Sequence, residues 1–480
     1  MRTQTSLFVP SGSRDAVKSL LPSLALPRYP AMHLRQFFLA VFTTAVASVN
    51  VWSESPRPTP NIILIVADDL GMGDLGVYGN DIIKTPHLDA LAAQGVVFNQ
   101  FYASANICSP SRAGLLTGRY PIRSGMAWDV VNANDEHGLP TEEVTIAEML
   151  DSAGYNTALV GKWHLGNRAE FWPTHHGFKS FYGVLHSNDM PNFALYENDK
   201  SIEQPVDQST LTRRYTERAV AFIEDNSKHP FFLYLAHTFP HIPLYASNAF
   251  AGRSQAGPYG DTVEEIDWST GEIVKALKQA GVYDNTLIFF TSDNGAWWEG
   301  SNAGAKGAKG STWDGAYRVG LIASWPQSVE AGQTSDVLSV NVDLLPTIAQ
   351  AAGTAIPVGI ELDGVGLLPF MQRRDGEVIE DRYFYYFDNE EIVAIRDQSW
   401  KLLRRAYYRR HLGALDKFDQ LPGFVEPYWL LFDLENDPAE RYSLADSHPE
   451  IVQRLKQEME QAEVMFREAA TRERVQTYPQ

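Results

Sequence analysis

Three uninterrupted apolar runs of strand length constrain the fold of this chain more than any other feature of its sequence. They are Asn61–Ala67, Phe231–Ala236 and Thr286–Thr291. A strand that is apolar on both of its faces has to be covered on both faces, which is typical of a parallel sheet. Patterns of helical period lie between the runs, at His87–Ala93, Thr145–Ala153, Thr212–Asp225 and Asp261–Ala280. The alternation predicts an α/β fold in which helices sandwich a large, mostly parallel or mixed sheet.

The pattern changes after about Asp381 and predicts a second, smaller domain. Four short aromatic-rich runs follow one another there, at Tyr383–Phe387, Ile392–Arg396, Trp400–Arg404 and Trp429–Asp433. A long, charged and amphipathic helical pattern then covers His448–Arg472. We therefore expect a main domain over residues 61–375 and a C-terminal domain of antiparallel sheet plus helix over residues 376–480.

The N-terminal residues predict export. A short stretch that ends in Arg35 precedes the apolar run Phe37–Val46, and Ala45-Val46-Ala47 has the small residues of a cleavage site. We interpret residues 32–47 as a signal peptide, 1–31 as an upstream extension and 48–60 as a lead-in; the alternative is a buried helix. The run is short for a membrane span, so no stable span is expected. The expected location is the periplasm, the exterior or a lysosome-like compartment.

Composition narrows the possible partners and excludes some kinds of site. The chain has 40 Lys and Arg against 59 Asp and Glu, a formal net charge of −19, and a single cysteine, Cys108. One cysteine excludes an intrachain disulfide and a thiolate cluster for zinc or iron–sulfur. The acidic balance repels polyanions, so nucleic acid is not an expected partner. An anionic substrate would require a local positive site within this field.

Acidic and amide side chains follow two of the apolar runs. Asp68-Asp69 comes directly after Asn61–Ala67, and Asp293-Asn294 follows the run that ends at Thr291. Ligands of parallel sheets bind beyond the carboxyl ends of the strands, so the four side chains could meet around one ion. Their oxygen atoms suit a hard divalent cation. The alternatives are a solvated acidic turn and an Asn-Gly turn.

The single cysteine precedes a proline and a helical pattern. In Cys108-Ser109-Pro110-Ser111-Arg112 the proline would lie in the first helical turn, with Cys108 at the helix N-terminus. Free N–H groups and the helix dipole there would lower the thiol pKa or bind an oxyanion. The alternative is a small buried apolar residue.

The motif Cys108-x-Pro110-x-Arg112, continued by Leu116-Thr117-Gly118-Arg119, resembles the signature of the type I sulfatases of the alkaline phosphatase-like superfamily. The resemblance extends from about Pro60 to the C-terminal helix and is greatest to the arylsulfatase and N-acetylgalactosamine-6-sulfatase branch. It implies that a formylglycine-generating maturation enzyme converts Cys108 to formylglycine. It also implies a sulfuric ester hydrolase that acts on an aryl or carbohydrate sulfate monoester, either a sulfated small molecule or a glycan.

The resemblance implies a set of site residues in this chain. One Ca²⁺ ion would be bound by Asp68, Asp69, Cys108, Asp293 and Asn294. The catalytic residues would be Cys108 as formylglycine, Arg112, Lys162, His164, His241 and Lys309. His237 and Lys306 lie close to two of these positions in the sequence, but the Ile-Pro pair after His241 and the Gly-Ser-Thr-Trp after Lys309 favour the residues named.

The family mechanism assigns each residue a task. The hydrated aldehyde offers one hydroxyl to attack sulfur and a second to expel sulfate as the aldehyde re-forms. His241 with Lys309 would protonate the leaving oxygen, His164 would accept the proton of the second hydroxyl, and Arg112 would hold the hydrate. Calcium and the three cationic side chains would neutralise the sulfate oxygens.

Three alternatives stay open. A phosphonate or phosphodiester hydrolase of the same superfamily shares the cysteine motif, but such relatives tend to have a histidine at the position of Asn294. A non-catalytic binder of sulfated glycans would leave Cys108 unmodified. A thiol hydrolase with a Cys–His pair would leave the acidic clusters without a role. Trp128, Trp297 and Trp298 could stack on a substrate ring or pack on the surface.

Overall fold

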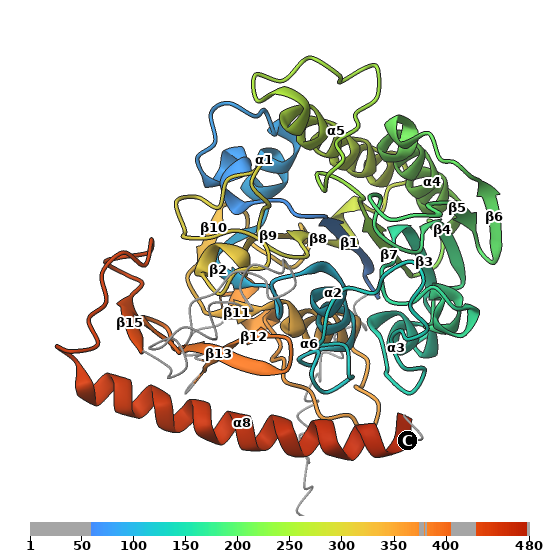
Figure 1. Cartoon of the computed structure of the whole chain (residues 1–480). Coiled ribbons are helices and arrows are strands. Elements are labelled where there is room, and N and C mark those ends of the chain that lie inside the picture. Colours follow the sequence, from blue (N-terminus) through green and yellow to red (C-terminus); the bar gives the residue numbers. More distant parts are fainter. Residues whose placement is uncertain (1–58, 374–378, 380–381, 405–428, 478–480) are drawn as a thin grey trace, which may run out of the picture. The chain divides into compact units, whose positions relative to one another are not determined.

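Five parallel strands form the centre of a mixed sheet in the computed structural model (Figure 1), which describes residues 59–373, 379, 382–404 and 429–477. The parallel neighbours run in the order β8-β1-β7-β3-β4. The full order is β10-β2-β9-β8-β1-β7-β3-β4-β5-β6, with β11 also paired to β2. The strands are β1 Asn61–Ala67, β2 Val96–Tyr102, β3 Asn156–Lys162, β4 Ser180–Val184, β5 Leu195–Glu197, β6 Lys200–Glu203, β7 Phe231–Ala236, β8 Thr286–Ser292, β9 Arg318–Ser324, β10 Gln333–Ser335 and β11 Ser339–Val340.

Helices cover both faces of this sheet (Figure 1). Alternate residues of β1 point to opposite faces, so Leu64 packs in the core beside α2, α3 and α6, and Ile65 packs in the core beside α1, α4 and α5. All seven residues of β1 are buried, which explains the unbroken apolar run. The helices are α1 Pro86–Ala93, α2 Cys108–Thr117, α3 Ile146–Ser152, α4 Leu211–Asn226, α5 Gly257–Gln279, α6 Leu344–Ala352, α7 Leu368–Met371 and α8 Pro449–Thr477.

A second sheet of four antiparallel strands follows the large sheet in the chain. Its order is β12-β13-β14-β15. The strands are β12 Phe384–Asp388, β13 Glu391–Arg396, β14 Trp400–Leu403 and β15 Leu430–Asp433. Leu455 and Phe466 of α8 are buried in a core that they share with this sheet and with Tyr102 of β2 and Tyr317. The aromatic side chains that mark these strands in the sequence therefore line the contact with the large sheet.

The fold class predicted from the sequence is confirmed, including the separate antiparallel sheet and the C-terminal helix. The structure adds strands that the apolar pattern did not reveal, and it shows that β9 pairs antiparallel with β8 and with β2. All described residues belong to one compact unit, Arg57–Gln480, and the boundary between residues 375 and 376 stays a prediction. The extension over residues 1–31, the signal peptide over residues 32–47 and nearly all of the lead-in lie outside the described residues. Among the described residues, no helix has the length and hydropathy that a membrane span requires.

Candidate active site

The carboxyl ends of the parallel strands bring the predicted site residues together. Asp68 and Asp69 follow β1, Lys162 ends β3, and Asp293 follows β8, while Cys108 is the first residue of α2. The Cys108 Sγ atom lies 3.4 Å from Asp68 Oδ1 and 3.9 Å from Asp69 Oδ1. One oxygen each of Asp68 and Asp293 and this sulfur atom lie within 4.8 Å of one another. The predicted meeting of two acidic strand ends is therefore present, with the cysteine beside it.

Two lysines bind these carboxylates. The Lys162 Nζ atom lies 2.5 Å from Asp68 Oδ2, and the Lys309 Nζ atom lies 2.7 Å from Asp69 Oδ1. Lys309 Nζ is also 3.0 Å from Cys108 Sγ, so it is directed at the side chain that begins the Cys-x-Pro-x-Arg motif. Lys306 lies elsewhere, over the ring of Trp313. The structure therefore brings Lys309 into the site and leaves Lys306 outside it.

Arg112 joins α2 to three strand ends. Its Nε atom donates to Asp293 Oδ2 at 2.8 Å, and one terminal nitrogen donates to the Lys162 carbonyl at 3.0 Å. The other terminal nitrogen lies 3.5 Å from Asp68 Oδ1. Burial alone would raise the pKa of Asp68, but Lys162, His241, Arg112 and Lys309 hold this pKa well below its usual range. Burial raises the pKa of Asp293 to about 6 against the opposing effect of Arg112.

His241 faces the same group of side chains, whereas neither ring nitrogen of His237 has a hydrogen-bond partner among the residues that the structure describes. The His241 Nε2 atom lies 3.7 Å from Asp69 Oδ2 and 3.4 Å from the Ser187 hydroxyl. Its Nδ1 atom lies 3.1 Å from Asn188 Oδ1 and 2.5 Å from the Ile242 carbonyl. Two acceptors at Nδ1 place the proton on that nitrogen, which leaves Nε2 directed at the carboxylates.

His164 is buried two residues after the end of β3. Its φ of 61° lies in the left-handed region, as does the φ of 64° at Asp69. Such backbone conformations are costly for residues with a side chain and are concentrated at functional sites. Burial, reinforced by Lys162 and Arg112, holds the pKa of His164 well below its usual range. The imidazole is therefore neutral at pH 7, in the form that can accept a proton.

The expectation of a lowered thiol pKa at Cys108 is wrong. Cys108 does begin α2, but only 1% of its surface is exposed. Burial raises the pKa of this thiol, and it outweighs the opposite effects of Lys162 and Lys309. A cysteine nucleophile requires a lowered pKa, so this environment argues against a thiol hydrolase.

Ser187 and Asn188 belong to the site although the sequence did not indicate them. They follow β4, the fourth parallel strand whose carboxyl end reaches the cluster. The Ser187 hydroxyl accepts a hydrogen bond from Lys162 at 3.3 Å and contacts His241, which Asn188 also holds. The available signal was the polar sequence His186-Ser187-Asn188-Asp189, which begins two positions after Val184, the last residue of β4.

The donor atoms around Cys108 suit a hard cation. Asp68, Asp69, Asp293 and Asn294 are all buried and offer carboxylate or amide oxygens, which calcium prefers. The Asn294 amide donates to Asp69 Oδ1 at 2.8 Å, and its own oxygen is buried without a hydrogen-bond partner. A buried acceptor without a donor fits the coordination of a cation. No other group of three or more potential metal-ligating side chains is found outside this site in the described part of the chain.

Comparisons with known proteins agree with this geometry. The family model for sulfatases matches residues 60–354, more than half of the chain. The chain belongs to the sulfatase family. A second model, the C-terminal part of N-sulphoglucosamine sulphohydrolase, matches residues 308–465. This sulfatase is therefore an enzyme that hydrolyses sulfate esters.

Named relatives cover most of this sulfatase. N-acetylgalactosamine-6-sulfatase of Sus scrofa is 38% identical over 446 residues, which covers 84% of each chain. Steryl-sulfatase of Homo sapiens is 33% identical over 511 residues and covers 84% of this chain and 87% of its own. The crystal structure of Ps i-CgsB with k-i-k-neocarrahexaose has a TM-score of 0.73 and 32% identity, and covers 84% of this chain and 93% of that one.

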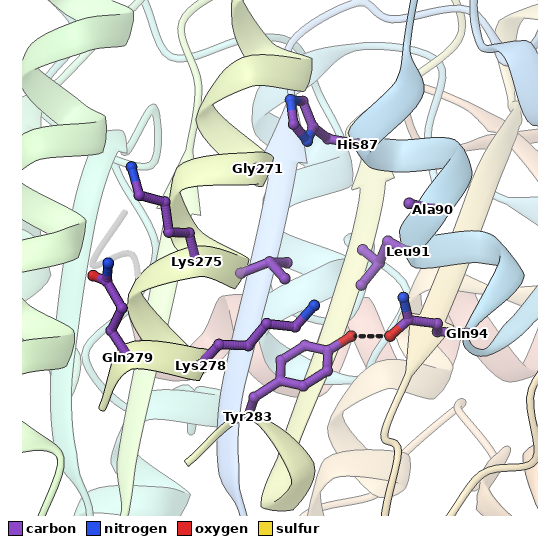
Figure 2. A pocket seen from close by; sticks show the side chains of 10 residues that line it. His87, Ala90, Leu91, Gln94, Gly271, Lys275, Lys278, Gln279 and Tyr283 are labelled. Atoms are coloured by element: carbon purple, nitrogen blue, oxygen red, sulfur yellow. Dashed lines mark hydrogen bonds between the residues drawn. The ribbon is translucent and has the colours of Figure 1, made fainter. Parts of the chain in front are cut away.

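A pocket of about 320 Å³ between α1 and α5 is separate from this site (Figure 2). Its lining includes His87, Lys278 and Tyr283, and the Tyr283 hydroxyl donates to Gln94 at 2.8 Å. Tyr283 precedes the start of β8, whereas Asp293 follows its end. At about 3.3 Å per residue, the seven residues of β8 separate the two places by about 20 Å. Tyr283 therefore places one end of this pocket near the start of β8, away from Asp293 in this sulfatase.

Two of the three tryptophans proposed for ring stacking are exposed. Trp128 is 61% exposed and Trp298 is 65% exposed, and Trp297 lies 6.2 Å from Trp298 between ring centroids. Trp297 and Trp298 follow Asp293 and Asn294 closely in the sequence of the sulfatase. Stacking of any of them on a substrate ring stays a prediction.

We expect Gly161→Ala to destabilise the strand that carries Lys162. Gly161 has a φ of 118°, and an added Cβ atom would lie 1.8 Å from the Ala236 carbonyl of β7. The free energy of unfolding should fall by at least about 2 kcal/mol, as measured by denaturant titration. Gly154→Ala is the matched control, because Gly154 also has a positive φ, of 87°, but open space around it. Its cost should stay near about 1 kcal/mol, and equal costs for the two variants would contradict the predicted clash.

Proposed function

We propose that this sulfatase removes sulfate from an aryl or carbohydrate sulfate monoester, using formylglycine derived from Cys108 with the assistance of one calcium ion. The position of the Cys108 Sγ atom, between Lys309 Nζ at 3.0 Å and Asp68 Oδ1 at 3.4 Å, is the observation that carries the proposal. This sulfur atom stands in for the hydroxyl oxygens of a hydrated aldehyde. Cationic and anionic groups thus face the one atom at which a nucleophile would form.

The calcium ligands would be Asp68, Asp69, Asp293, Asn294 and the modified residue 108. The buried Asn294 oxygen without a donor and the all-oxygen side chains support this set. Each carboxylate has two oxygens with several lone pairs, so contacts with Lys162 and Lys309 do not exclude an ion. When bound, the ion would supply positive charge next to the sulfate oxygens.

The cationic side chains compensate the charge of the substrate. Arg112, Lys162 and Lys309 are buried within an acidic protein, and together they balance the three carboxylates Asp68, Asp69 and Asp293. A divalent ion added to this balanced set would make the site positive, as an anionic ester requires. The site would thus attract sulfate against the negative field of the whole chain.

The histidines divide the proton transfers. His164 would accept the proton that is lost when sulfate is expelled, because its lowered pKa leaves the imidazole neutral and able to bind a proton. Burial, followed by the effect of Lys309, lowers the pKa of His241, but a bound anion would raise it again. His241, held through Nδ1 by Asn188, would then share with Lys309 the protonation of the leaving oxygen.

The names of the relatives support the class of substrate. Two of them are named for sulfate on N-acetylgalactosamine and on a sterol, and the solved structure of Ps i-CgsB holds an oligosaccharide. We infer that the substrate of this chain is a sulfated glycan or a sulfated small molecule with a ring. A panel of sulfated monosaccharides, oligosaccharides and aryl alcohols, read by sulfate release, would identify it.

The experiment that tests the reaction class compares two esters of the same phenol. We expect an aryl sulfate to be hydrolysed with a kcat/KM at least about 100-fold above that of the corresponding aryl phosphonate. The reason is that the oxygen ligand Asn294 favours calcium over the transition metals that histidine binds. Faster hydrolysis of the phosphonate would contradict the proposal and favour a phosphonate hydrolase. If the protein releases no sulfate from either a ring sulfate or an aryl sulfate, the result would favour a non-catalytic binder.

Maturation and export complete the proposal. The maturation enzyme would act on Cys108 before the protein folds, because the folded chain buries this side chain. Residues 32–47 would direct export and be removed, so the mature N-terminus is expected near Ser48. N-terminal sequencing of the protein from its host, together with cell fractionation, tests both statements.

A further inference from the structure

The segment that carries Lys309 is held by the C-terminal sheet. We define the lysine loop as residues 303–317, which connect the site residues after β8 to the start of β9. Trp313 of this loop packs edge-on against Phe432 of β15, with 6.0 Å between ring centroids. Lys401 of β14 donates to the Thr312 carbonyl at 3.3 Å. The C-terminal sheet supplies none of the predicted site residues, yet it contacts the loop that supplies one.

Buried ions make the main contact between the loop and this sheet. Lys401 Nζ lies 2.7 Å from Glu440 Oε1 and 3.8 Å from Asp314 Oδ1. The other Glu440 carboxylate oxygen accepts the backbone N–H of Asp314 at 2.8 Å. Asp314 and Lys401 are about 1% exposed or less, and Glu440, which follows β15, is fully buried. Glu440 is thus bound both to the lysine of the sheet and to the backbone of the loop.

Tyrosines of both sheets hold the carboxylate of Asp314. The Tyr386 hydroxyl of β12 donates to Asp314 Oδ1 at 2.5 Å, and the Tyr102 hydroxyl of β2 donates to Asp314 Oδ2 at 3.0 Å. Arg396 of β13 in turn donates to the Tyr102 hydroxyl. Residue 314 is therefore fixed from three directions, five residues after Lys309.

Glu440 also contacts the other end of the loop. Its backbone carbonyl accepts a hydrogen bond from Lys306 Nζ at 3.1 Å, and Gly315 N–H donates to the Lys306 carbonyl at 2.8 Å. Glu440 has a φ of 50°, which is costly for a residue with a side chain. Lys306 and Asp314 lie on either side of Lys309 in the sequence, so one residue holds the loop at both flanks.

The buried charges of this contact indicate that it does more than stabilise the fold. Taking a lysine and two carboxylates out of water costs more than packing apolar side chains of the same volume, so buried ion pairs are poor stabilisers. They do fix one geometry, because any other arrangement leaves a charge unpaired in a medium of low polarity. The lysine loop needs one geometry, since Lys309 Nζ must meet both Asp69 and Cys108.

We propose that Glu440 and Lys401 are positioning residues, which act through the lysine loop to hold Lys309 against the reacting centre. The inference rests on the proposed function, in which Lys309 helps to protonate the leaving oxygen. A displaced Lys309 should hinder the departure of a poorly acidic alcohol and hardly affect that of an acidic phenol, which needs no proton. The positioning role therefore has a signature that general destabilisation lacks.

The test compares variants over a series of aryl sulfates whose phenols differ in acidity. The double variant Lys401→Met/Glu440→Gln removes both charges of the closest pair together. Asp314 loses Lys401, at 3.8 Å, but keeps its hydrogen bonds from Tyr386 and Tyr102. We expect kcat/KM to fall about 10- to 100-fold for the least acidic phenol and less than about 3-fold for the most acidic one. Lys309→Ala should give the steepest dependence on phenol acidity and serves as the reference.

Leu455→Ala is the matched control. Leu455 is fully buried in α8 in the core beneath the C-terminal sheet, and its apolar side chain forms none of the hydrogen bonds or ion pairs that hold the lysine loop. This variant should lower the melting temperature while leaving the dependence on phenol acidity unchanged. Formylglycine content of every variant is measured by peptide mass, so that incomplete maturation is not mistaken for a kinetic effect.

Hydrogen exchange gives a readout that does not depend on catalysis. Amides of residues 303–316 should exchange faster in the double variant than in the wild type, and at the wild-type rate in Leu455→Ala. If the double variant does not fold, Lys306→Met replaces it, because Lys306 is partly exposed and its loss removes the bond to the Glu440 carbonyl. That variant should show the same faster exchange in the loop and the same change in the dependence on phenol acidity, each of smaller magnitude.

The possible results test the positioning role and the proposed function separately. Wild-type exchange in the loop and a wild-type dependence on phenol acidity, in a folded positioning variant, would overturn the positioning role. Failure of the wild type to release sulfate from any aryl or carbohydrate sulfate would overturn the proposed function instead. A wild-type dependence in Lys309→Ala would overturn the role that the proposed function gives to Lys309. Even in that case, faster exchange confined to the lysine loop would support the conclusion that Lys401 and Glu440 order this loop.

Discussion

Replacing Cys108 by alanine is expected to lower kcat by at least about 10⁴-fold while the protein stays folded. The side chain at residue 108 supplies the attacking atom in the proposed reaction, and removal of a nucleophile leaves only binding and charge compensation. The free energy of unfolding should change by no more than about 1 kcal/mol, because one buried sulfur atom is lost. Sulfate release and a denaturant titration of the same preparation measure the two quantities. A Cys108→Ala protein with more than about a tenth of wild-type activity would refute the assigned role.

Cys108→Ser is the matched variant that separates the two halves of the reaction. Serine retains one hydroxyl, which can attack sulfur and release the alcohol, but no second hydroxyl on the same carbon is present to expel the sulfate. We therefore expect at most one equivalent of alcohol per enzyme, without turnover, and a peptide around residue 108 that gains the mass of one SO₃ group. Sustained turnover by this variant would contradict the need for a hydrated aldehyde.

Calcium is expected to stabilise the wild-type protein and to lose this effect when Asp69 is replaced by asparagine. A ligand that binds only the folded state at 100 times its Kd adds about 2.7 kcal/mol to the free energy of unfolding. The calcium dependence of the melting temperature after chelation measures this contribution. Asp69→Asn removes one proposed ligand and also the partner of Lys309, so kcat/KM should fall by about 10³-fold.

Asp261→Asn is the control for the loss of a buried carboxylate. Asp261 is 4% exposed and accepts backbone hydrogen bonds from Gly252, Arg253 and Ser254, away from the proposed ligands. This variant should be less stable than the wild type but should retain the full calcium-dependent shift. An undiminished shift in Asp69→Asn would contradict the proposed calcium site.

The strands that consist of long apolar runs were predictable from the sequence. The candidate site residues that follow these strands were predictable too. Asn61–Ala67 and Thr286–Ser292 are buried on both faces, so their apolar pattern is continuous and Asp68 and Asp293 stand out where it stops. The strand Ser180–Val184 is short and contains Gly183, which packs against the backbone of Gly161. Its pattern is weak for this reason, and Ser187 and Asn188 were missed with it.

Contacts made over long sequence separations explain what the sequence could not predict. The helix N-terminus at Cys108 was predicted correctly, but the direction of its pKa shift depends on the complete burial that distant strands impose. The bond between Asp314 and Glu440 joins residues 126 positions apart. Neither residue carries a local pattern that indicates its partner, so the contact between the C-terminal sheet and the lysine loop emerges only in the folded chain.

The mass of the peptide that contains Cys108, from an active preparation of the protein made in its natural host, tests the central claim most directly. In formylglycine the CH2–SH side chain of cysteine has become an aldehyde, CHO, so the two peptides have different masses, and only the aldehyde reacts with hydrazide probes. We expect the aldehyde in a fraction of the molecules that matches the fraction able to turn over an aryl sulfate. A fully active preparation in which this peptide carries only the free thiol would contradict it.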